Sequence, residues 1–473
     1  SHSGSLKRKH NDRIAPSAPT PVAESKKSNE KYTKSNNCNK KKKTKLFATP
    51  LSASIKKQNE KLILFREIRQ VDRKLGQLKE QREELEKDYG SNQHDIDNTN
   101  SMIRQFYVEL AKKEAAYKAI LKTENQEDTT DALNFRSEKF MLDNVHGREK
   151  IPSACVEIID TPQFQRLRSL KQLGLCYYVF PTACHNRFEH SIGVMHLAGK
   201  LVRGVLDRQP HLKFRVSDTD ILCVQLAGLC HDLGHGPFSH TYDGKFVKAL
   251  RTEKDFDWAH EHASAALFDY MLQSNEGLRD KFNSYGLWDE DIYFIKELIF
   301  GSKNDAPKGW IWKGRGKGKE YLYEIVANHR NGIDVDKFDY FARDCLHLGI
   351  PTSFDPHRLM RFARILSDDG KTTQIGYHEK EAWNIYELFH TRYNLHKRAY
   401  QHRVARSIEA MLVDALIYAN DFMILTANDM TPVKMSHAME HMDVYTKLTD
   451  SIFKRIEWDA EVDDNLKKSE ALL

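Results

Sequence analysis

A regular apolar seam runs through the N-terminal part of the chain. Between residues 64 and 89 apolar side chains alternate at spacings of four and three, and the register resumes after Gly90-Ser91 as far as residue 120. This heptad pattern predicts a coiled coil or helical hairpin over residues 54–126. Either one helix runs through the Gly-Ser interruption or two helices fold back on each other, and the length of the segment favours self-association.

Residues 135–473 instead show one helical pattern after another, with few alternating runs. The apolar run at 221–229 is typical of a buried helix, which the glycines after it would end. Another helix is predicted to begin at Thr161-Pro162, with threonine as N-cap and proline as the first helical residue, and a further one near Arg187. The expected fold class is mainly α.

Three of the predicted helices align polar side chains on one face. The three sets are Gln165, Arg168 and Gln172; Asp336, Tyr340 and Asp344; and Arg392, His396 and Tyr400. Burying carboxylates without partners is costly, and a metal at Asp336 with a polar ligand beside the other two residues would remove that cost. The guanidinium, imidazole and phenol on the last face could bind the phosphates, base and sugar of a nucleotide. The alternative is that this face is simply solvated.

Charge divides the chain into a basic tail and a nearly balanced body. The 473 residues carry a net charge of +6, and most of the excess lies near the N-terminus. Residues 1–53 contain few large apolar side chains and are expected to be disordered. The clusters at 7–9 and 40–43 are typical of nuclear-import signals, which predicts a nuclear or nuclear and cytoplasmic protein. A solubilising tail is the alternative, and its lysines also suit weak binding of single-stranded nucleic acid.

Cysteine usage and hydropathy exclude two further classes. The seven cysteines form no Cys-x-x-Cys pair, which indicates reduced thiols in an intracellular protein. No apolar run reaches membrane-spanning length and no signal core precedes the body, so we expect a soluble protein without a membrane partner.

The candidate chemistry is concentrated in the segment LCHDLGHGPFSH at 229–240. His231 and Asp232 are a mixed nitrogen and oxygen ligand pair for a divalent transition metal, for which iron, manganese and zinc are all suitable. Adjacent side chains can bind one ion only where the helix ends. His235 and His240 are placed for proton transfer. A chance cluster of packed histidines is the alternative reading.

Two more metal ligands are predicted outside this segment. His190 shares a helix face with apolar residues, so its ring is expected to point inward, opposite His231-Asp232, as the third ligand. Asp336, at the start of its polar stripe, is the fourth candidate.

These residues carry a resemblance to a known family. The order His190, His231-Asp232, Asp336 resembles the H…HD…D ligand order of the HD metal-dependent phosphohydrolases. Longer motifs resemble the eukaryotic sterile-alpha-motif and HD-domain deoxynucleoside triphosphate triphosphohydrolases, an antiviral family of innate immunity, almost without gaps from about residue 139 to 454. The motifs are DTPQFQRLR at 160–168, HNRFEH at 185–190, HDLGHGPFSH at 231–240 and NGIDVDKFDYFARD at 331–344.

The resemblance implies hydrolysis of dNTPs to deoxynucleoside and triphosphate, with the transition metal joined by Mg²⁺. His240 would protonate the leaving 5′ oxygen, while His235, Asp243 and His260 would position or relay protons. Substrate contacts would come from three groups of residues. These are Arg187, Lys337 and Arg392 for the phosphates; Tyr340, Asp344 and Tyr400 for the sugar; and Gln172, Leu173, His396 and Gln401 for the base.

The resemblance also implies activation by GTP and dNTPs bound between subunits of a homo-oligomer, from dimer to tetramer. The matching residues are Lys139, Asp160, Gln165 and Arg168 for the guanine nucleotide, and Val179, Arg358, Phe362, Lys380, Asn384 and His402 for the dNTP effector. Phe140, Leu142 and His378 depart from the family's valine, asparagine and arginine. The chain is expected to end before the family's C-terminal lobe, and its predicted coiled coil lies where a sterile-alpha-motif domain would be.

Two other functions remain open at this point. Another HD enzyme, such as a phosphodiesterase or nuclease, would not release intact tripolyphosphate. A non-catalytic nucleic-acid-binding scaffold would bind in a strongly salt-dependent way and show no turnover with metal.

Overall fold

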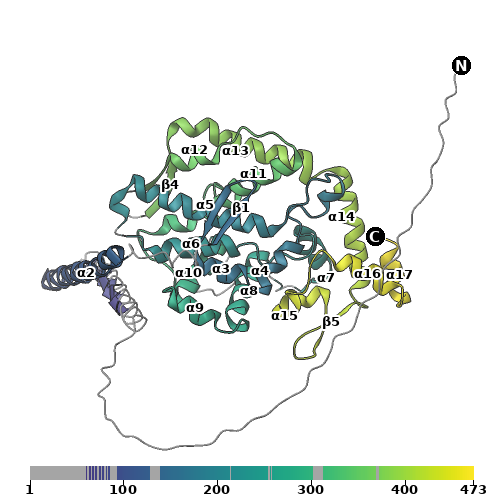
Figure 1. The fold of residues 1–473 in the computed structure, drawn as a ribbon, viewed down its shortest axis with the longest axis horizontal. Coiled ribbons are helices and arrows are strands. Elements are labelled where there is room, and N and C mark those ends of the chain that lie inside the picture. The colour runs from purple at the N-terminus through teal and green to yellow at the C-terminus, as the bar shows by residue number, and fades with distance from the viewer. Residues whose placement is uncertain are drawn as a thin grey trace, which may run out of the picture. The chain divides into compact units, whose positions relative to one another are not determined.

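The computed structural model describes the helical body and part of the segment before it. The described residues are 93–127, 139–213, 215–253, 256, 258–301, 313–368 and 372–473, with scattered positions between 60 and 85. Helices dominate this described part (Figure 1), so the mainly α fold class is confirmed. The tail predicted over residues 1–53 lies outside the described residues. Among those that are described, no helix combines the length and apolar character needed to cross a bilayer.

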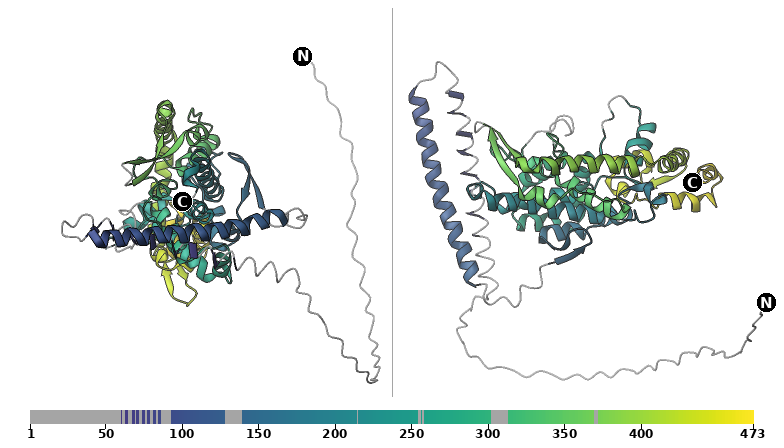
Figure 2. Two further views of the ribbon diagram at one scale, coloured as in Figure 1. Left: turned by 90° about the vertical axis from the view of Figure 1, so that its left-hand side faces the viewer. Right: turned by 90° about the horizontal axis from the view of Figure 1, so that it is seen from above.

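The segment before the body forms two helices packed against each other. Helix α2 (Gln93–Glu127) follows the helical positions between 60 and 85. Val71 and Leu75 are buried together with Ile103, and Lys113 Nζ lies 2.8 Å from Glu67 Oε2. Earlier residues of the first helix therefore meet later residues of α2, so the helices run antiparallel (Figure 2). The structure has the hairpin rather than one continuous helix, and self-association stays a prediction.

Three helices form the centre of the body: α5 (Arg187–Arg208), α6 (Asp218–Cys230) and α11 (Val335–Leu348). Helix α5 packs against both α6 and α11. Each of the three begins at a polar residue that serves as its N-cap, respectively Asn186, Ser217 and Asp334. The caps fix where each helix begins and so which of its side chains face the centre.

The other helices surround this centre. They are α3 (Ser153–Ile159), α4 (Pro162–Gln165), α7 (Lys248–Leu250), α8 (His260–Ser274), α9 (Leu278–Ser284), α10 (Asp289–Phe300), α12 (Pro356–Arg361), α13 (Ala382–Leu395), α14 (Arg403–Ala419), α15 (Met442–Tyr445), α16 (Ile452–Ala460) and α17 (Lys467–Glu470). Three antiparallel two-stranded sheets complete the described body. They are β1 (Lys139–Asp143) with β2 (Gly147–Ile151), β3 (Ala363–Asp368) with β4 (Thr372–Tyr377), and β5 (Ile424–Thr426) with β6 (Pro432–Lys434).

The helix predicted from Thr161 is shorter than expected. The Thr161 side chain caps it as predicted, but α4 ends at Gln165 and only a 3₁₀ turn follows, to Ser169. Lys171 then pairs with Asn186 in a β-bridge, which draws the backbone out of the helix. The prediction that Gln172 shares the polar face of this helix is therefore wrong.

The loop after α6 is held in place by residues from distant parts of the chain. The buried Arg166 guanidinium donates to the carbonyl oxygens of Leu233, at 3.1 Å, and His235, at 2.8 Å. The Tyr445 hydroxyl donates to the carbonyl oxygen of Gly234 at 2.7 Å. These bonds satisfy buried backbone carbonyls and fix the loop that carries the HD segment.

Gly234 permits this loop to lie directly against α8, and its substitution is expected to destabilise the protein. A Cβ at this position would lie 2.1 Å from the His260 carbonyl oxygen and 2.3 Å from the Ser264 backbone nitrogen. Because neither backbone atom can move alone, we expect Gly234→Ala to lower the free energy of unfolding by about 1–3 kcal/mol or more, measured by denaturant unfolding.

Gly244→Ala is the matched control for that change. A Cβ at Gly244 meets no heavy atom within 4 Å, and the residue is helical. The control is expected to leave stability unchanged or raise it by about 0.4–1 kcal/mol. Equal unfolding midpoints for the two variants would contradict the packing argument.

Candidate metal and nucleotide site

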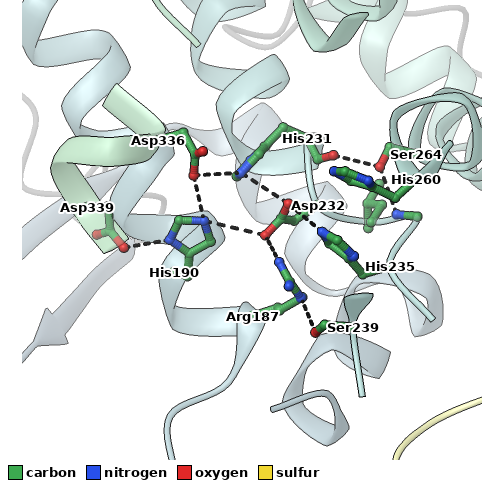
Figure 3. A network of polar contacts seen from close by, with 12 residues as sticks. Arg187, His190, His231, Asp232, His235, Ser239, His260, Ser264, Asp336 and Asp339 are labelled. Carbon is green, nitrogen blue, oxygen red and sulfur yellow. Dashed lines mark hydrogen bonds and ion pairs between the residues drawn. The ribbon is translucent and has the colours of Figure 1, made fainter. Parts of the chain in front are cut away.

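Four side chains from three helices converge at the centre of the body (Figure 3). His190 lies in α5, His231 and Asp232 directly follow α6, and Asp336 lies in the first turn of α11. Asp336 Oδ1 is 3.1 Å from His190 Nε2 and 3.4 Å from His231 Nε2. Asp232 lies 3.4 Å from His190 Nε2 and 3.3 Å from His231 Nε2. The structure thus brings the four predicted metal ligands to one point.

The chemistry of these side chains fits a divalent cation. The Nδ1 atom of His231 faces the carbonyl oxygen of Gly228 at 2.8 Å, whereas its buried Nε2 atom has no hydrogen-bond partner. The ring therefore directs a free nitrogen toward the carboxylates of Asp232 and Asp336. Two imidazoles with two carboxylates are a common ligand set for divalent transition metals.

Electrostatics around His190 also favour positive charge at this point. Burial lowers the pKa of His190, but hydrogen bonds to Asp336 and Asp339 outweigh it and raise the pKa to about 10. For Asp336, burial acts to raise the pKa, yet the neighbouring side chains of His190 and His231 hold it below its usual value. The carboxylates thus stabilise a cation among the four side chains.

Asp339 orients His190, and the sequence reading missed it. This fully buried carboxylate accepts a hydrogen bond from His190 Nδ1 at 2.7 Å. Arg343 also donates to it, from Nε and one NH group at 2.8 Å each. Gly193 leaves room for it, since a Cβ there would lie 1.9 Å from the Asp339 oxygen. Its position three residues after Asp336, on the same helix face, is the signal that could have identified it.

A second group of histidines lies beside Asp232. His235 Nδ1 is 2.8 Å from Asp243 Oδ2, and its Nε2 atom faces Asp232 Oδ1 at 3.4 Å. The rings of His235 and His260 stack with centroids 4.0 Å apart, and His240 lies edge-on to both. All four predicted proton-transfer residues therefore form one cluster next to the metal ligands.

Burial sets the protonation of this cluster. It lowers the pKa of His235 well below the usual value and raises that of Asp243 to about 8. Burial is also the main reason that the pKa values of His240 and His260 fall to about 4, with Arg187 adding to the effect. At pH 7 the three imidazoles and the Asp243 carboxyl are neutral, so each imidazole has one nitrogen without a proton and the cluster carries no charge before a proton is transferred.

Arg187 lies between the two groups. One of its NH groups donates to Asp232, and its Nε atom donates to Ser239 Oγ at 2.8 Å. Phe238 and Ser239 have left-handed backbone conformations, with φ of 55° and 57°. Asp450 holds this turn by accepting the Phe238 N–H at 2.6 Å. Strained non-glycine backbone of this kind is typical of functional sites.

A cavity of about 480 Å³ opens onto these residues. It is large enough for a nucleotide-sized ligand. Of the predicted substrate contacts, nine line it: Gln172, Leu173, Arg187, Tyr340, Asp344, Arg392, His396, Tyr400 and Gln401. The tenth, Lys337, is not among the lining residues, because its Nζ atom pairs with Asp334 at 2.9 Å.

The sugar-contact candidates are tied together by hydrogen bonds. Tyr400 donates its hydroxyl to Asp344 Oδ2 at 2.5 Å, and the other Asp344 oxygen lies 2.7 Å from His185 Nε2. The sequence reading assigned no role to His185. The His185 ring stacks on that of His347 with centroids 4.3 Å apart. Asp344 is thus held in one orientation by Tyr400 on one oxygen and His185 on the other.

The helix that carries Arg392, His396 and Tyr400 changes its geometry within the site. Helix α13 ends at Leu395, and a π-helical turn spans His396–Tyr400. The predicted α-helical spacing is therefore wrong beyond residue 395, although all three side chains still line the cavity. Such π turns occur often at functional sites.

The residues predicted for the guanine nucleotide form two pairs. Lys139 Nζ is 3.1 Å from both carboxylate oxygens of Asp160. Arg168 donates to Gln165 at 2.7 Å, and its guanidinium lies 3.5 Å from the centre of the Phe188 ring. Lys139, Asp160 and Arg168 are exposed and Gln165 is half-buried, and none of the four lines the cavity.

The residues predicted for the dNTP effector fall into two places. Arg358 and Asn384 both bind Glu381, at 2.8 and 3.0 Å, and Phe362 and Lys380 lie beside His378. Val179 precedes Phe180, whose ring lies 5.8 Å from that of His402. Within the described chain no hydrogen bond, ion pair or ring contact joins these residues across the two places, so the single protomer leaves them separate.

Comparison with known proteins agrees with this geometry. Residues 187–344 match the HD domain family, a segment that runs from Arg187 in α5 to Asp344 in α11. The chain is 51% identical over 340 residues to deoxynucleoside triphosphate triphosphohydrolase SAMHD1 of Bos taurus, and 49% identical over 338 residues to that of Homo sapiens. The SAMHD1 homolog of Dictyostelium discoideum is 41% identical over 347 residues.

The similarity covers 71%, 71% and 73% of this chain, and 56%, 53% and 60% of the three relatives, respectively. The chain therefore spans little more than half the length of the curated relatives it matches. The HD domain match at 187–344 includes all four metal-ligand candidates.

Proposed function

Because this chain is an HD-domain protein related in sequence to the SAMHD1 deoxynucleoside triphosphate triphosphohydrolases, we propose that it hydrolyses dNTPs to deoxynucleoside and tripolyphosphate. The observation that carries the proposal is the convergence of His190, His231, Asp232 and Asp336, three of which (His190, Asp232 and Asp336) line a nucleotide-sized cavity. A packing role alone would not account for carboxylates and imidazoles gathered at the same point.

The four ligands would hold a divalent transition metal, with iron, manganese and zinc all suited to the donor set and Mg²⁺ as a second ion at the phosphates. Bound there, a metal supplies Lewis-acid stabilisation of the phosphoryl oxygens and makes a bound water more acidic. Arg187 holds Asp232 in the orientation that this role requires, and Asp339 does the same for His190.

His240 is proposed as the proton donor to the leaving 5′ oxygen. Burial keeps its pKa near 4 in the free protein, so the ring is neutral at pH 7. The negative charge of a bound triphosphate acts to raise that pKa and so favours a protonated His240 in the complex. His235 would exchange protons with Asp243 along their hydrogen bond, and His260, stacked on His235, would help to position it.

The nucleotide would lie along the cavity with its phosphates toward Arg187 and Arg392. Tyr340, Asp344 and Tyr400 would surround the sugar, and the fixed Tyr400 ring would leave no room for a 2′ hydroxyl. Gln172, Leu173, His396 and Gln401 would contact the base. Lys337 would first have to leave Asp334 before it could reach a phosphate.

Product analysis tests the proposed reaction. We expect the full chain with Mn²⁺ and Mg²⁺ to convert dGTP to deoxyguanosine and intact tripolyphosphate in equal amounts, with GTP cleaved far more slowly as a substrate. Chromatography of the nucleoside and phosphate products checks this. Release of pyrophosphate or orthophosphate instead would assign another hydrolase reaction.

Regulation is proposed at the two surface positions described above. GTP would bind at Lys139, Asp160, Gln165 and Arg168. A dNTP would bind at the residues predicted for the dNTP effector, whose two places would be brought together by a second protomer. Self-association through the helical hairpin would bring protomers together by raising their effective concentration. Measuring dGTP hydrolysis with and without GTP at several protein concentrations tests this, and rates that depend on neither would contradict it.

A further inference from the structure

We infer that His146 is a positioning residue for the metal ligand His190 and that it acts through the carboxylate of Asp339. His146 lies in the turn between β1 and β2, far from His190 in the chain. The inference rests on the proposed metal site. It assigns to the β1–β2 hairpin a part in holding that site.

The contacts form a direct line from the turn to the ligand. The His146 side chain is 2% exposed, and its Nε2 atom lies 2.6 Å from Asp339 Oδ1. The other carboxylate oxygen, Oδ2, accepts from His190 Nδ1 at 2.7 Å. Each imidazole therefore has its own oxygen, and the carboxylate cannot rotate without losing one of these bonds.

Asp339 accepts hydrogen bonds from every side. Arg343 donates to both of its oxygens, from Nε and one NH group at 2.8 Å each. A carboxylate paired in this way with a guanidinium acts as an acceptor, so both imidazoles donate to it. With its proton on Nδ1, His190 presents Nε2 toward Asp336, 3.1 Å away. His146 thus helps to fix the tautomer and tilt of a metal ligand.

The turn itself is held in a way that keeps His146 in place. Asp143 Oδ1 accepts the backbone N–H groups of Val145 and His146, each at 2.8 Å. Its second oxygen accepts from Arg343 at 2.9 Å. Arg343 therefore binds both Asp143 and Asp339, and it aligns the turn with the carboxylate that His146 reaches.

His196 offers a matched comparison. This residue lies in α5, its Nδ1 atom pairs with Glu149 of β2, and its ring centroid is 5.7 Å from that of His146. It attaches the same β1–β2 hairpin to the body through Glu149 and not through Asp339. If His146 acted only by attaching the hairpin to the body, removal of His196 would have the same consequences.

Titration of the full chain with Mn²⁺, without nucleotide, tests the inference. We expect His146→Ala to weaken Mn²⁺ binding about 10-fold, as is typical when a partner of a metal-binding histidine is lost. His146→Gln, which keeps an N–H donor, should recover part of the affinity. His196→Ala should lower the melting temperature without changing the Mn²⁺ affinity. With dGTP as substrate at fixed Mn²⁺, His146→Ala should lower kcat and leave KM unchanged.

Two results would overturn the inference. One is that folded His146→Ala binds Mn²⁺ with the affinity of the wild type, whether or not folded His146→Gln does so as well. The other is an equal loss of affinity in His196→Ala, which would make hairpin attachment the cause. A wild-type chain that binds Mn²⁺ but cleaves no dNTP would refute the proposed reaction and leave the role of His146 intact.

Discussion

Replacing His231 with alanine is expected to abolish metal binding and to lower dGTP hydrolysis roughly 1,000-fold or more, because Lewis-acid stabilisation contributes several kcal/mol to such reactions. His231 supplies a buried nitrogen without a hydrogen-bond partner, 3.3 Å from Asp232 and 3.4 Å from Asp336. No neighbouring nitrogen can take its position. Metal content by elemental analysis and tripolyphosphate release under saturating dGTP are the measurements.

The fold is expected to survive this change. His231 follows the last residue of α6, and its one hydrogen bond goes to the carbonyl oxygen of Gly228. Far-ultraviolet circular dichroism should therefore match the wild type. His211→Ala, at an exposed position of the body, is the matched control and should retain metal and activity. Hydrolysis retained in His231→Ala would refute the ligand assignment.

Asp339→Asn is expected to weaken metal binding about 10- to 100-fold while every ligand stays in place. The asparagine side chain has nearly the same shape but carries no charge, and its NH₂ group would face one of three donors: His146, His190 or Arg343. The buried Arg343 also loses an ionic partner, and breaking such a pair costs about 3–5 kcal/mol of stability. Metal titration and denaturant unfolding measure the two effects separately.

Asp421→Asn controls for the loss of a carboxylate as such. Asp421 pairs with Lys434 at the surface, with its side chain 67% exposed. Exposed pairs of this kind contribute at most about 1 kcal/mol. Metal affinity in this variant should equal that of the wild type. Unchanged metal affinity in Asp339→Asn would mean that the carboxylate has no part in orienting His190.

Local patterns in the sequence were enough to select four side chains that the structure brings together, and to predict where two helices begin. The apolar face around His190 indicates that it points inward, and the glycines after Asp232 indicate where α6 ends. Both signals depend on neighbours along the chain, as does the threonine cap at Thr161. The mainly α fold followed from the same periodicities.

Other features depend on contacts between distant residues and leave no local pattern. His146 and His185 reach Asp339 and Asp344 across 193 and 159 positions. The sequence alone does not distinguish a Lys337 that pairs with Asp334, as in the structure, from a Lys337 that faces the cavity without a partner. An apolar seam is the same whether it packs within one chain or between two, so the hairpin could not be chosen over a continuous helix.

The hydrogen bonds that hold the loop after α6 determine how this protein can be divided into shorter pieces. Tyr445 bonds to Gly234 across 211 positions, and Asp450 bonds to Phe238 across 212, both from outside the matched HD segment of 187–344. Arg166 reaches the same loop from before that segment begins. A piece of the chain limited to those borders would keep every candidate ligand but lose the hydrogen bonds that hold their loop. The smallest piece that keeps this loop in its observed shape must therefore extend from before Arg166 to beyond Asp450.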